Sequence, residues 1–309
     1  MVWQENNPGP FGDNNKYTAS INYNYRNYDI YMKKSVDGGL TFSKEINLSN
    51  NPGYSEHPHI AVSGNNVYVV WIDDTSSIST TTVTTKNKEI LFRKSITDRR
   101  SISGQKNYPK VAAFENSTYV VWNVGIIGDT NNNNISNGIF FMKSLDSGNS
   151  FSDTIKLNSN SNSIGESQIA AYRNDVYVVW GGNPDEKIVG NMFFVKSADN
   201  GNNFSKAESL TGDEKNSLNV EVIADENNNV YVAWQALLSD HNLLSHNEEI
   251  LLKKSSDNGA TFTHTNENIS NNKGISECTS IAVSDNNRVY LVWEDDTTGN
   301  HEILFARNI

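Results

Sequence analysis

The chain has 309 residues, 36% of them hydrophobic and 10% aromatic, and a formal net charge of -11 at pH 7. This acidic balance lacks the basic footprint that nucleic-acid binding requires, and no apolar stretch approaches the roughly 18 residues of a membrane helix. The single cysteine, Cys278, excludes a disulfide framework and any zinc site built from several cysteines.

A short phrase of Val and Tyr residues that ends in Trp recurs along the chain. The chain opens on the tail of this phrase, Met1-Val2-Trp3, and five full copies end at Trp71, Trp122, Trp180, Trp234 and Trp293. From Trp71 onward, successive tryptophans are 51, 58, 54 and 59 positions apart. A period of this size predicts a propeller or another repeat array.

Each repeat is predicted to hold four strands in the same order. A short apolar segment comes first, and an Asn/Gly turn joins it to the Trp phrase, whose Val and Tyr residues favour strands. A third segment ends in lysine, as at 29–34 and 249–254, and a fourth begins at a phenylalanine, as at Phe42 and Phe262. Because no segment shows a sustained helical period, the unit is predicted to be a four-stranded antiparallel meander. We interpret the recurring lysine as charge that discourages strand-to-strand aggregation.

Four copies of one loop connect the third and fourth segments. The carboxylate of its aspartate can accept N–H bonds of its own turn, its glycine supplies a backbone angle that other side chains forbid, and its phenylalanine buries a ring between sheets. The second repeat departs from the pattern, since 95–101 keeps no glycine and its fourth strand is hard to place. The copies follow S-x-D-x-G-x-[STN]-F and contain Asp37, Asp146, Asp199 and Asp257.

This loop resembles the Asp-box, or BNR repeat, of the sialidase-like propellers, and the resemblance covers nearly the whole chain. It implies an all-β fold, a six-bladed β-propeller of four-stranded antiparallel blades. Seven blades are the alternative if further sequence precedes Met1. Asp-boxes are structural in the family, so the four aspartates are expected to stabilise turns rather than to catalyse.

We expect one propeller domain over residues 1–309. Its first blade lacks the innermost strand, and its last blade lacks the outermost strand, because the chain stops at Ile309. Propellers usually close by letting one terminus complete the blade of the other. We therefore expect an N-terminally truncated piece of a longer precursor, in which the missing part supplies the closing strands.

The meander places the Asp-box-like loops at one end of each sheet, here named the turn end. Loops between the second and third segments lie at the opposite end, named the loop end. These loops differ most among the repeats, which is typical of a functional surface, although tolerated surface drift is the alternative. They cover 4–27, 72–88, 123–137, 181–190, 235–248 and 294–300.

The resemblance to sialidases implies three arginines that bind a substrate carboxylate at the loop end, with a Tyr–Glu pair and an Asp. Of the arginines in this chain, only Arg26 lies in such a loop, and the Arg-Ile-Pro phrase of the family is absent. A clamp of three guanidinium groups cannot be assembled. We assign no catalytic residue, and we expect the chain not to be an enzyme; if it is one, the expected class is a glycoside hydrolase.

Aromatic and acidic side chains compete for the loop end. Tyrosine offers a flat apolar face with a polar tip, which suits sugars or a protein partner, although alternate tyrosines can instead pack in an extension of the third strand. Asp295 and Asp296, which follow Glu294, are the metal candidates, for Ca²⁺. Glu56 and Glu277 lie at equivalent positions before a strand, and a solvated acidic rim is the alternative. The ligand-binding candidates are Tyr23, Tyr25, Arg26, Tyr28, Asp73 and Asp74.

Histidines are interpreted as surface residues, because His57 and His59, and likewise His241 and His246, lack a third metal ligand. The favoured function is non-catalytic binding of a glycan or an extracellular protein by a secreted or cell-surface protein. A sialidase-like glycoside hydrolase is one alternative, and a structural module of a larger extracellular assembly is the other. Apart from the Ca²⁺ hypothesis no cofactor is expected, and neither nucleic acid nor a membrane span is expected.

Overall fold

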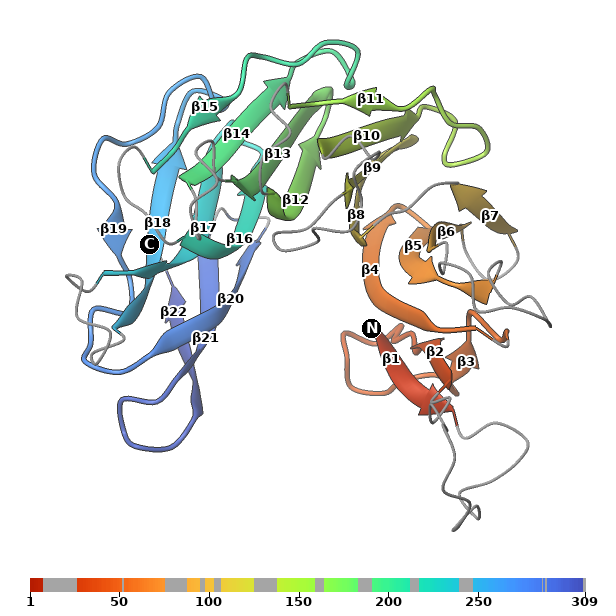
Figure 1. The fold of residues 1–309 in the computed structure, drawn as a ribbon, viewed down its shortest axis with the longest axis horizontal. Helices are drawn as coiled ribbons and strands as arrows, with labels where there is room; N and C mark the ends of the chain where they lie inside the picture. The colour runs from red at the N-terminus through yellow and green to blue at the C-terminus, as the bar shows by residue number, and fades with distance from the viewer. Residues whose placement is uncertain are drawn as a thin grey trace, which may run out of the picture. The chain divides into compact units, whose positions relative to one another are not determined.

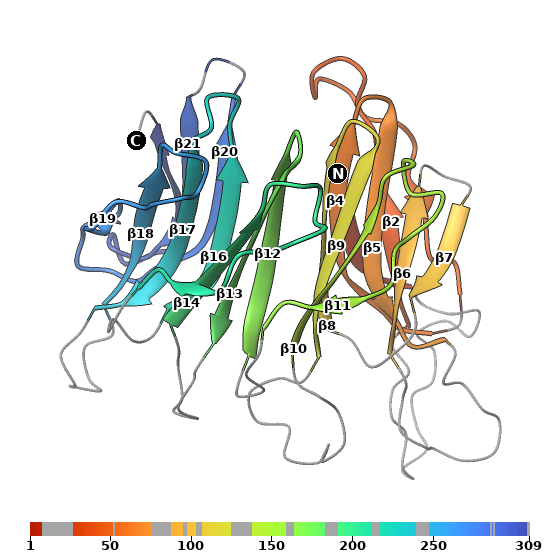
Figure 2. The ribbon, with the colours of Figure 1, turned by 90° about the horizontal axis from the view of Figure 1, so that it is seen from above.

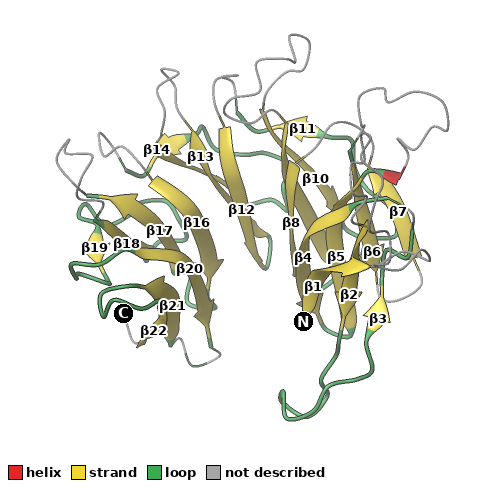
Figure 3. Ribbon diagram, turned by 60° about the horizontal axis from the view of Figure 1, so that its bottom comes forward, coloured by secondary structure: helices red, strands yellow, loops and turns green. Residues whose placement is uncertain are grey.

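The structure is a computed structural model of the chain (Figure 1). It describes residues 1–7, 27–51, 53–75, 88–94, 98–102, 107–124, 138–158, 164–182, 191–211, 217–238, 247–284, 286 and 288–307. These residues form strands and connecting loops; Figure 3 draws one short piece as helix, and none of the described residues is in an α-helix. Within these ranges, therefore, no helix exists that could cross a membrane.

The chain divides into two compact units, Met1–Val111 and Ala112–Ile309. The first unit holds two antiparallel sheets, each a meander in chain order. One sheet consists of β1 (Val2–Asn7), β2 (Asn27–Met32) and β3 (Ile46–Asn47), and the other consists of β4 (Ser55–Ser63), β5 (Asn66–Asp73), β6 (Glu89–Lys94) and β7 (Asp98–Ile102).

Four further antiparallel sheets follow, and the boundary between the units falls within the first strand of the first of them. Three of these sheets have four strands and the last has three. They are β8 (Asn107–Phe114), β9 (Ser117–Val124), β10 (Gly138–Ser144) and β11 (Ile155–Lys156); β12 (Ile164–Tyr172), β13 (Asp175–Gly182), β14 (Asn191–Ser197) and β15 (Glu208–Ser209); β16 (Ser217–Ala224), β17 (Val230–Leu237), β18 (Glu248–Ser255) and β19 (Glu267–Asn268); and β20 (Ser276–Val283), β21 (Val289–Asp295) and β22 (Glu302–Arg307).

The prediction of an all-β fold made of antiparallel meanders is confirmed, and six sheets are consistent with six blades. The fourth strand of the second repeat, which the sequence did not locate, is β7, paired antiparallel with β6. The expectation of one domain over residues 1–309 stays a prediction.

The Trp phrases form the most deeply buried strands. In β5, every residue from Tyr68 to Ile72 is at most 2% exposed. Apolar residues need not alternate along such a strand, because both faces of its sheet are covered. In the second unit, Tyr177, Phe194 and Trp234 share one core cluster, and the leading strands β12, β16 and β20 lie side by side (Figure 2). Each fully buried Val, Leu or Phe side chain contributes roughly 1.5–3 kcal/mol.

In the second unit, the S-x-D-x-G turns after β14 and β18 each fasten their sheet to the preceding one. Tyr119 Oη on β9 donates a hydrogen bond to Asn200 Oδ1 in the turn after β14 (3.2 Å), and Lys143 Nζ on β10 donates to Asn202 of the same turn. Gly201 has a φ of 72°, and a Cβ atom there would lie 2.6 Å from the ring of Phe141. The turn therefore requires glycine both for its backbone angle and for its contact with the neighbouring sheet.

The same arrangement recurs one sheet later. Tyr177 Oη donates to Asn258 Oδ1, Lys196 Nζ donates to Asn258 O (3.0 Å), and the rings of Phe194 and Phe262 meet edge to face with centroids 4.9 Å apart. Two of the recurring lysines, Lys143 and Lys196, thus bridge neighbouring sheets. Their interpretation as charge against strand-to-strand aggregation does not include this role.

Candidate functional site

The aspartates of the S-x-D-x-G turns are saturated by their own turns. Asp146 accepts hydrogen bonds from Ser144 Oγ (2.6 Å), Ser150 N (2.8 Å) and Ser150 Oγ (2.6 Å). These bonds hold the pKa of the Asp146 carboxyl group well below its usual range. A carboxylate held in this way is a poor acid or base near neutral pH. Equivalent bonds, which support the expected structural role, surround Asp37, Asp199 and Asp257.

A second carboxylate-centred turn lies at the loop end of β5. Asp73 is 3% exposed, and its Oδ2 accepts hydrogen bonds from Asn51 Nδ2 (2.6 Å), Ser55 Oγ (2.8 Å) and Trp71 Nε1 (3.3 Å). Its Oδ1 accepts the backbone N–H of Thr75 (3.0 Å). Burial alone would raise the pKa of Asp73, but the hydrogen bonds outweigh burial and hold this pKa below its ordinary value.

The same turn recurs at the loop end of β21. Asp295 Oδ2 accepts hydrogen bonds from Asn272 Nδ2 (2.6 Å), Ser276 Oγ (2.7 Å) and Trp293 Nε1 (3.3 Å), and Oδ1 accepts Thr297 N (3.0 Å). The pKa of Asp295 is again lowered by hydrogen bonds that outweigh burial. The two turns are thus one motif used in two sheets.

The aspartate that follows each of these residues also bonds to its own turn. Asp74 Oδ1 accepts Tyr54 N (2.6 Å), and Asp296 Oδ1 accepts Ile275 N (2.6 Å). No contact among the described residues supports ligand binding by Asp73 and Asp74 or Ca²⁺ binding by Asp295 and Asp296. Both hypotheses therefore stay predictions for these four aspartates.

A third sheet keeps the donors of this motif without its carboxylate. Ala236 pairs with Ser217 across β16 and β17, as Asp295 pairs with Ser276 across β20 and β21. Ser217 Oγ and Trp234 Nε1 are buried, and neither has a hydrogen-bond partner within the described residues. The loop end therefore varies in chemistry while its backbone register is kept.

Of the candidates Tyr23, Tyr25, Arg26 and Tyr28, the structure describes Tyr28; the other three lie outside the described residues. The ring centroid of Tyr28, on β2, is 6.1 Å from that of Tyr54, which precedes β4, and the ring planes are tilted by 44°. Both side chains are partly exposed. The first unit thus presents an aromatic pair beside the turn of Asp73.

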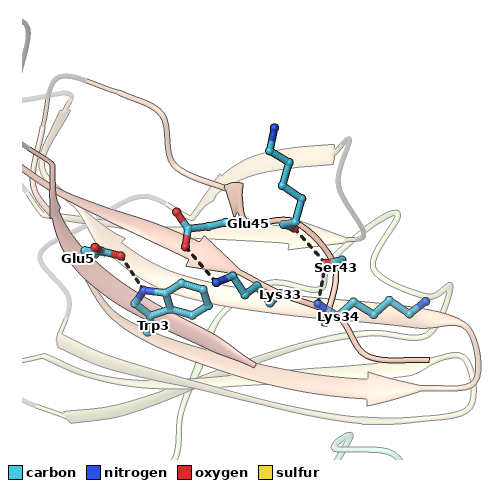
Figure 4. Close-up of polar contacts among 7 residues, drawn as sticks. Trp3, Glu5, Lys33, Lys34, Ser43 and Glu45 are labelled. Carbon is cyan, nitrogen blue, oxygen red and sulfur yellow. Dashed lines mark hydrogen bonds and ion pairs between the residues drawn. The ribbon is translucent and has the colours of Figure 1, made fainter. Parts of the chain in front are cut away.

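Further along β2, packing within the sheet prevails. The rings of Trp3 and Tyr31 are stacked with centroids 6.2 Å apart. Lys33 Nζ lies 5.5 Å from the Trp3 ring (Figure 4). Lys33 also pairs with Glu45 (3.5 Å), and Trp3 Nε1 donates to Glu5 (3.0 Å). Burial raises the pKa of Tyr31. For this tyrosine the packing alternative therefore holds.

Arginines with described side chains do not occupy the loop end. Arg93, on β6, donates to Leu48 O. Arg173 follows β12 with its guanidinium over the Tyr172 ring, Arg288 precedes β21, and Arg307 ends β22, so these three lie at the turn end of their sheets. The described arginines thus provide no three-guanidinium clamp at the loop end.

His59 is not the surface residue that the sequence suggested. Its Nδ1 accepts a hydrogen bond from the backbone N–H of Val111 (3.2 Å), and the residue is only partly exposed. Burial lowers the pKa of His59 to about 3, and the nearby charge of Lys110 acts in the same direction. The ring is therefore neutral near pH 7 and serves as a structural acceptor.

The leading strands bend near the loop end. In β20 the register shifts between Glu277 and Ser280, and Cys278 has a φ of 54°. Register shifts occur at the same point of β4 and β16. A bulge sets two residues against one and redirects side chains. In β20 it leaves Glu277 directly opposite Glu294 of β21.

These bends bring three side chains with metal-binding atoms together. Glu277, Glu294 and His301 each offer a ligand atom, and these atoms all lie within 4.8 Å of one another. His301 Nδ1 is 2.7 Å from Glu294 Oε1. Burial raises the pKa of the Cys278 thiol, and the charges of Glu277, Glu294 and Glu248 raise it further. Glu277 and Glu294 thus lie together at this part of the loop end.

Sequence reasoning included the two glutamates in an acidic rim but missed His301. The position of His301 could have indicated it. His301 directly precedes the third strand of its repeat, as Lys88 does in the second repeat, and this position lies at the loop end.

No protein-family model and no curated protein matches this sequence. Solved structures are similar in fold. The Hadza microbial sialidase Hz136 has 12% identity and a TM-score of 0.57, covering 91% of this chain and 60% of its own. The Trypanosoma rangeli sialidase in complex with sialic acid has 14% identity and a TM-score of 0.55, covering 92% and 50%. The NanB sialidase from Streptococcus pneumoniae has 10% identity and a TM-score of 0.56, covering 92% and 62%.

The chain thus spans between 50% and 62% of the length of these sialidases. At such low identities the likeness shows the fold alone. The six antiparallel sheets have the fold of a sialidase-like β-propeller.

Proposed function

We propose that this chain is a non-catalytic, extracellular binding propeller that recognises carbohydrate through Tyr28 and Tyr54. The proposal is supported by the geometry of this pair, whose two partly exposed rings lie 6.1 Å apart at the loop end of the first unit. Aromatic faces stack on the apolar face of a sugar ring, and the phenolic hydroxyls can bond to sugar hydroxyls.

Charged groups follow the tyrosine pair along the chain and suit polar recognition. Glu56, two residues beyond Tyr54, pairs with Lys88 (2.5 Å). A carboxylate and an ammonium together supply acceptors and donors for sugar hydroxyls. Lys88 directly precedes β6, and Glu56 lies at the bend of β4, so both project from the loop end of one sheet.

The states of the other carboxylates support binding rather than catalysis. The aspartates of the S-x-D-x-G turns and of the Asp73 and Asp295 turns are held ionised by hydrogen bonds within their own turns. A general acid requires a pKa near the working pH, which these groups lack.

A glycan array tests the proposal with wild type, Tyr28→Ala and Tyr54→Ala. Tyr172→Ala, which removes a partly exposed tyrosine at the turn end of β12, is the matched control. We expect binding to one glycan class, weakened about tenfold or more by either loop-end variant. Truncating an aromatic anchor commonly costs about 2 kcal/mol of binding free energy, and about 1.4 kcal/mol corresponds to a tenfold loss of affinity. Glycan binding that neither variant weakens would refute the tyrosine site.

Glycoside hydrolysis is the second candidate, because the fold is shared with sialidases and the carboxylate oxygens of Glu277 and Glu294 approach within 4.8 Å. Retaining glycosidases other than sialidases use two carboxyl groups about 5 Å apart. Release of fluorophore from a panel of synthetic glycosides, abolished by Glu277→Gln, would establish this candidate in place of ours. A blank array without hydrolysis would favour a structural module of a larger assembly.

A further inference from the structure

We propose that Glu277, Glu294 and His301 form a binding site for a divalent transition-metal ion at the loop end of the β20–β22 sheet. Their ligand atoms lie within 4.8 Å of one another, as atoms around one ion must. The set combines one imidazole nitrogen with two carboxylates, which are zinc ligands in proteins. The site lies entirely within the second unit and is independent of the proposed tyrosine site.

The β4–β6 strands of the first unit provide an internal comparison. The register pairs Glu56 with Ile72, as it pairs Glu277 with Glu294. Lys88 and His301 occupy the third equivalent position, because each precedes the residue that pairs with the aspartate of its turn. The same three backbone positions thus hold two different sets of side chains.

These two sets differ in charge. In the first unit, one carboxylate is balanced by one ammonium group, with Lys88 Nζ 2.5 Å from Glu56 Oε1. In the second unit, two glutamates face each other across adjacent strands, an arrangement that is destabilising between like charges. The single imidazole of His301 can neutralise at most one of them. A divalent cation would bond to all three groups and offset the remaining charge.

A third sheet avoids facing carboxylates on its first two strands, because a side-chain amide replaces one of them. The equivalent positions of β16–β18 hold Leu218, Gln235 and Glu248, and Gln235 Nε2 donates a hydrogen bond to Glu248. Asn219 Nδ2 donates in turn to Gln235 Oε1 (2.6 Å). Of these three sheets, β20–β22 is the one whose three positions all carry metal-binding atoms.

The donor set favours zinc or cobalt over calcium. Imidazole nitrogen suits Zn²⁺ and other first-row transition metals, whereas Ca²⁺ takes six to eight oxygen ligands. Three protein ligands leave at least one position of a four-coordinate ion for water or for another ligand.

Titration calorimetry with Zn²⁺, and visible spectroscopy with Co²⁺, test the site in the full chain. We expect one metal ion to bind per chain, with an affinity that depends on Glu277, Glu294 and His301, and we expect Ca²⁺ to bind more weakly. Glu277→Gln, Glu294→Gln and His301→Lys should each weaken Zn²⁺ binding about tenfold or more. His301→Lys places the ammonium group found at Lys88 in the equivalent position and removes the imidazole ligand, so its fold should be intact. Glu56→Gln is the matched control and should leave binding unchanged.

Thermal melts of each variant separate ligand loss from unfolding. The proposal is overturned by absence of saturable Zn²⁺ binding to folded wild type, or by affinity that is the same in wild type and all three variants. Binding that is lost in Glu56→Gln but kept in Glu277→Gln would place the ion elsewhere and would also overturn it.

Discussion

At the turn end of the second unit, Tyr119 and Tyr177 make the same hydrogen bond to the turn of the following sheet. At the loop end, by contrast, equivalent positions hold Asp295 in one sheet and Ala236 in another. The turn end repeats one set of contacts because neighbouring sheets must pack in one way. The loop end keeps the register and changes the side chains, so differences in chemistry between repeats concentrate there.

Removing a carboxylate from the loop end should have the largest effect. Asp73→Ala leaves Asn51, Ser55 and Trp71 donors without their acceptor. Because each buried unsatisfied group costs about 1–3 kcal/mol, we expect a loss of about 4 kcal/mol in the free energy of unfolding. Urea denaturation measures it, with Asp73→Asn, which keeps an acceptor oxygen, as the milder control. A loss under 1 kcal/mol would contradict the structural role of this turn.

A glycine at the turn end should come next. Gly201→Ala places a Cβ atom 2.6 Å from Phe141 at a φ of 72°. Backbone strain and overpacking together should cost about 3 kcal/mol. Gly39→Ala is the matched control, since it has a φ of 90° and no atom within 4 Å of the added Cβ. It should cost about 1–2 kcal/mol from strain alone. Equal losses in the two variants would show that contact with the neighbouring sheet is unimportant.

Acid should weaken the first unit through His59. Its pKa in the folded protein, about 3, lies below the ordinary value of about 6.5, so the unfolded chain binds more protons between these limits. The contribution is therefore complete above pH 6.5 and declines as the pH falls toward 3. At pH 5 the expected loss relative to pH 7 is about 2 kcal/mol.

Denaturation at pH 7 and pH 5 measures this loss, and His59→Gln, which retains an acceptor, should reduce it. The difference between wild type and His59→Gln isolates this imidazole from the other five histidines. An unchanged pH dependence in His59→Gln would assign the effect to other groups.

The smallest effect should be a gain. Ala236→Asp places an acceptor opposite Ser217 Oγ and near Trp234 Nε1, as Asp295 does for its own sheet. Two satisfied donors, offset by burial of the new charge, should stabilise by about 1 kcal/mol. Ala236→Asn controls for the charge. Destabilisation by both variants would mean that β16 and β17 have lost the room for this turn.

The repeat made the fold predictable from sequence. Strand order, the S-x-D-x-G turns and the buried Trp phrases follow from local patterns, because each residue mainly serves its own sheet and its neighbour. β7 was missed because its turn lacks the glycine that marks the other repeats. The candidate site was harder to predict. From the sequence, Asp73 and Asp295 have the character of ligand-binding carboxylates. Their hydrogen-bond partners Asn51 and Asn272, however, lie more than 20 positions away and become visible only in the structure.

The contacts of the turns after β14 and β18 with the preceding sheets have a mechanical consequence. In a pulling experiment, a sheet of the second unit can detach only after the Tyr, Lys and Phe contacts to its neighbour break. Nearest-neighbour coupling of this kind gives stepwise failure. The extension trace should therefore show discrete rips, each about one repeat in contour length, and Tyr177→Phe should lower the force of one rip among them.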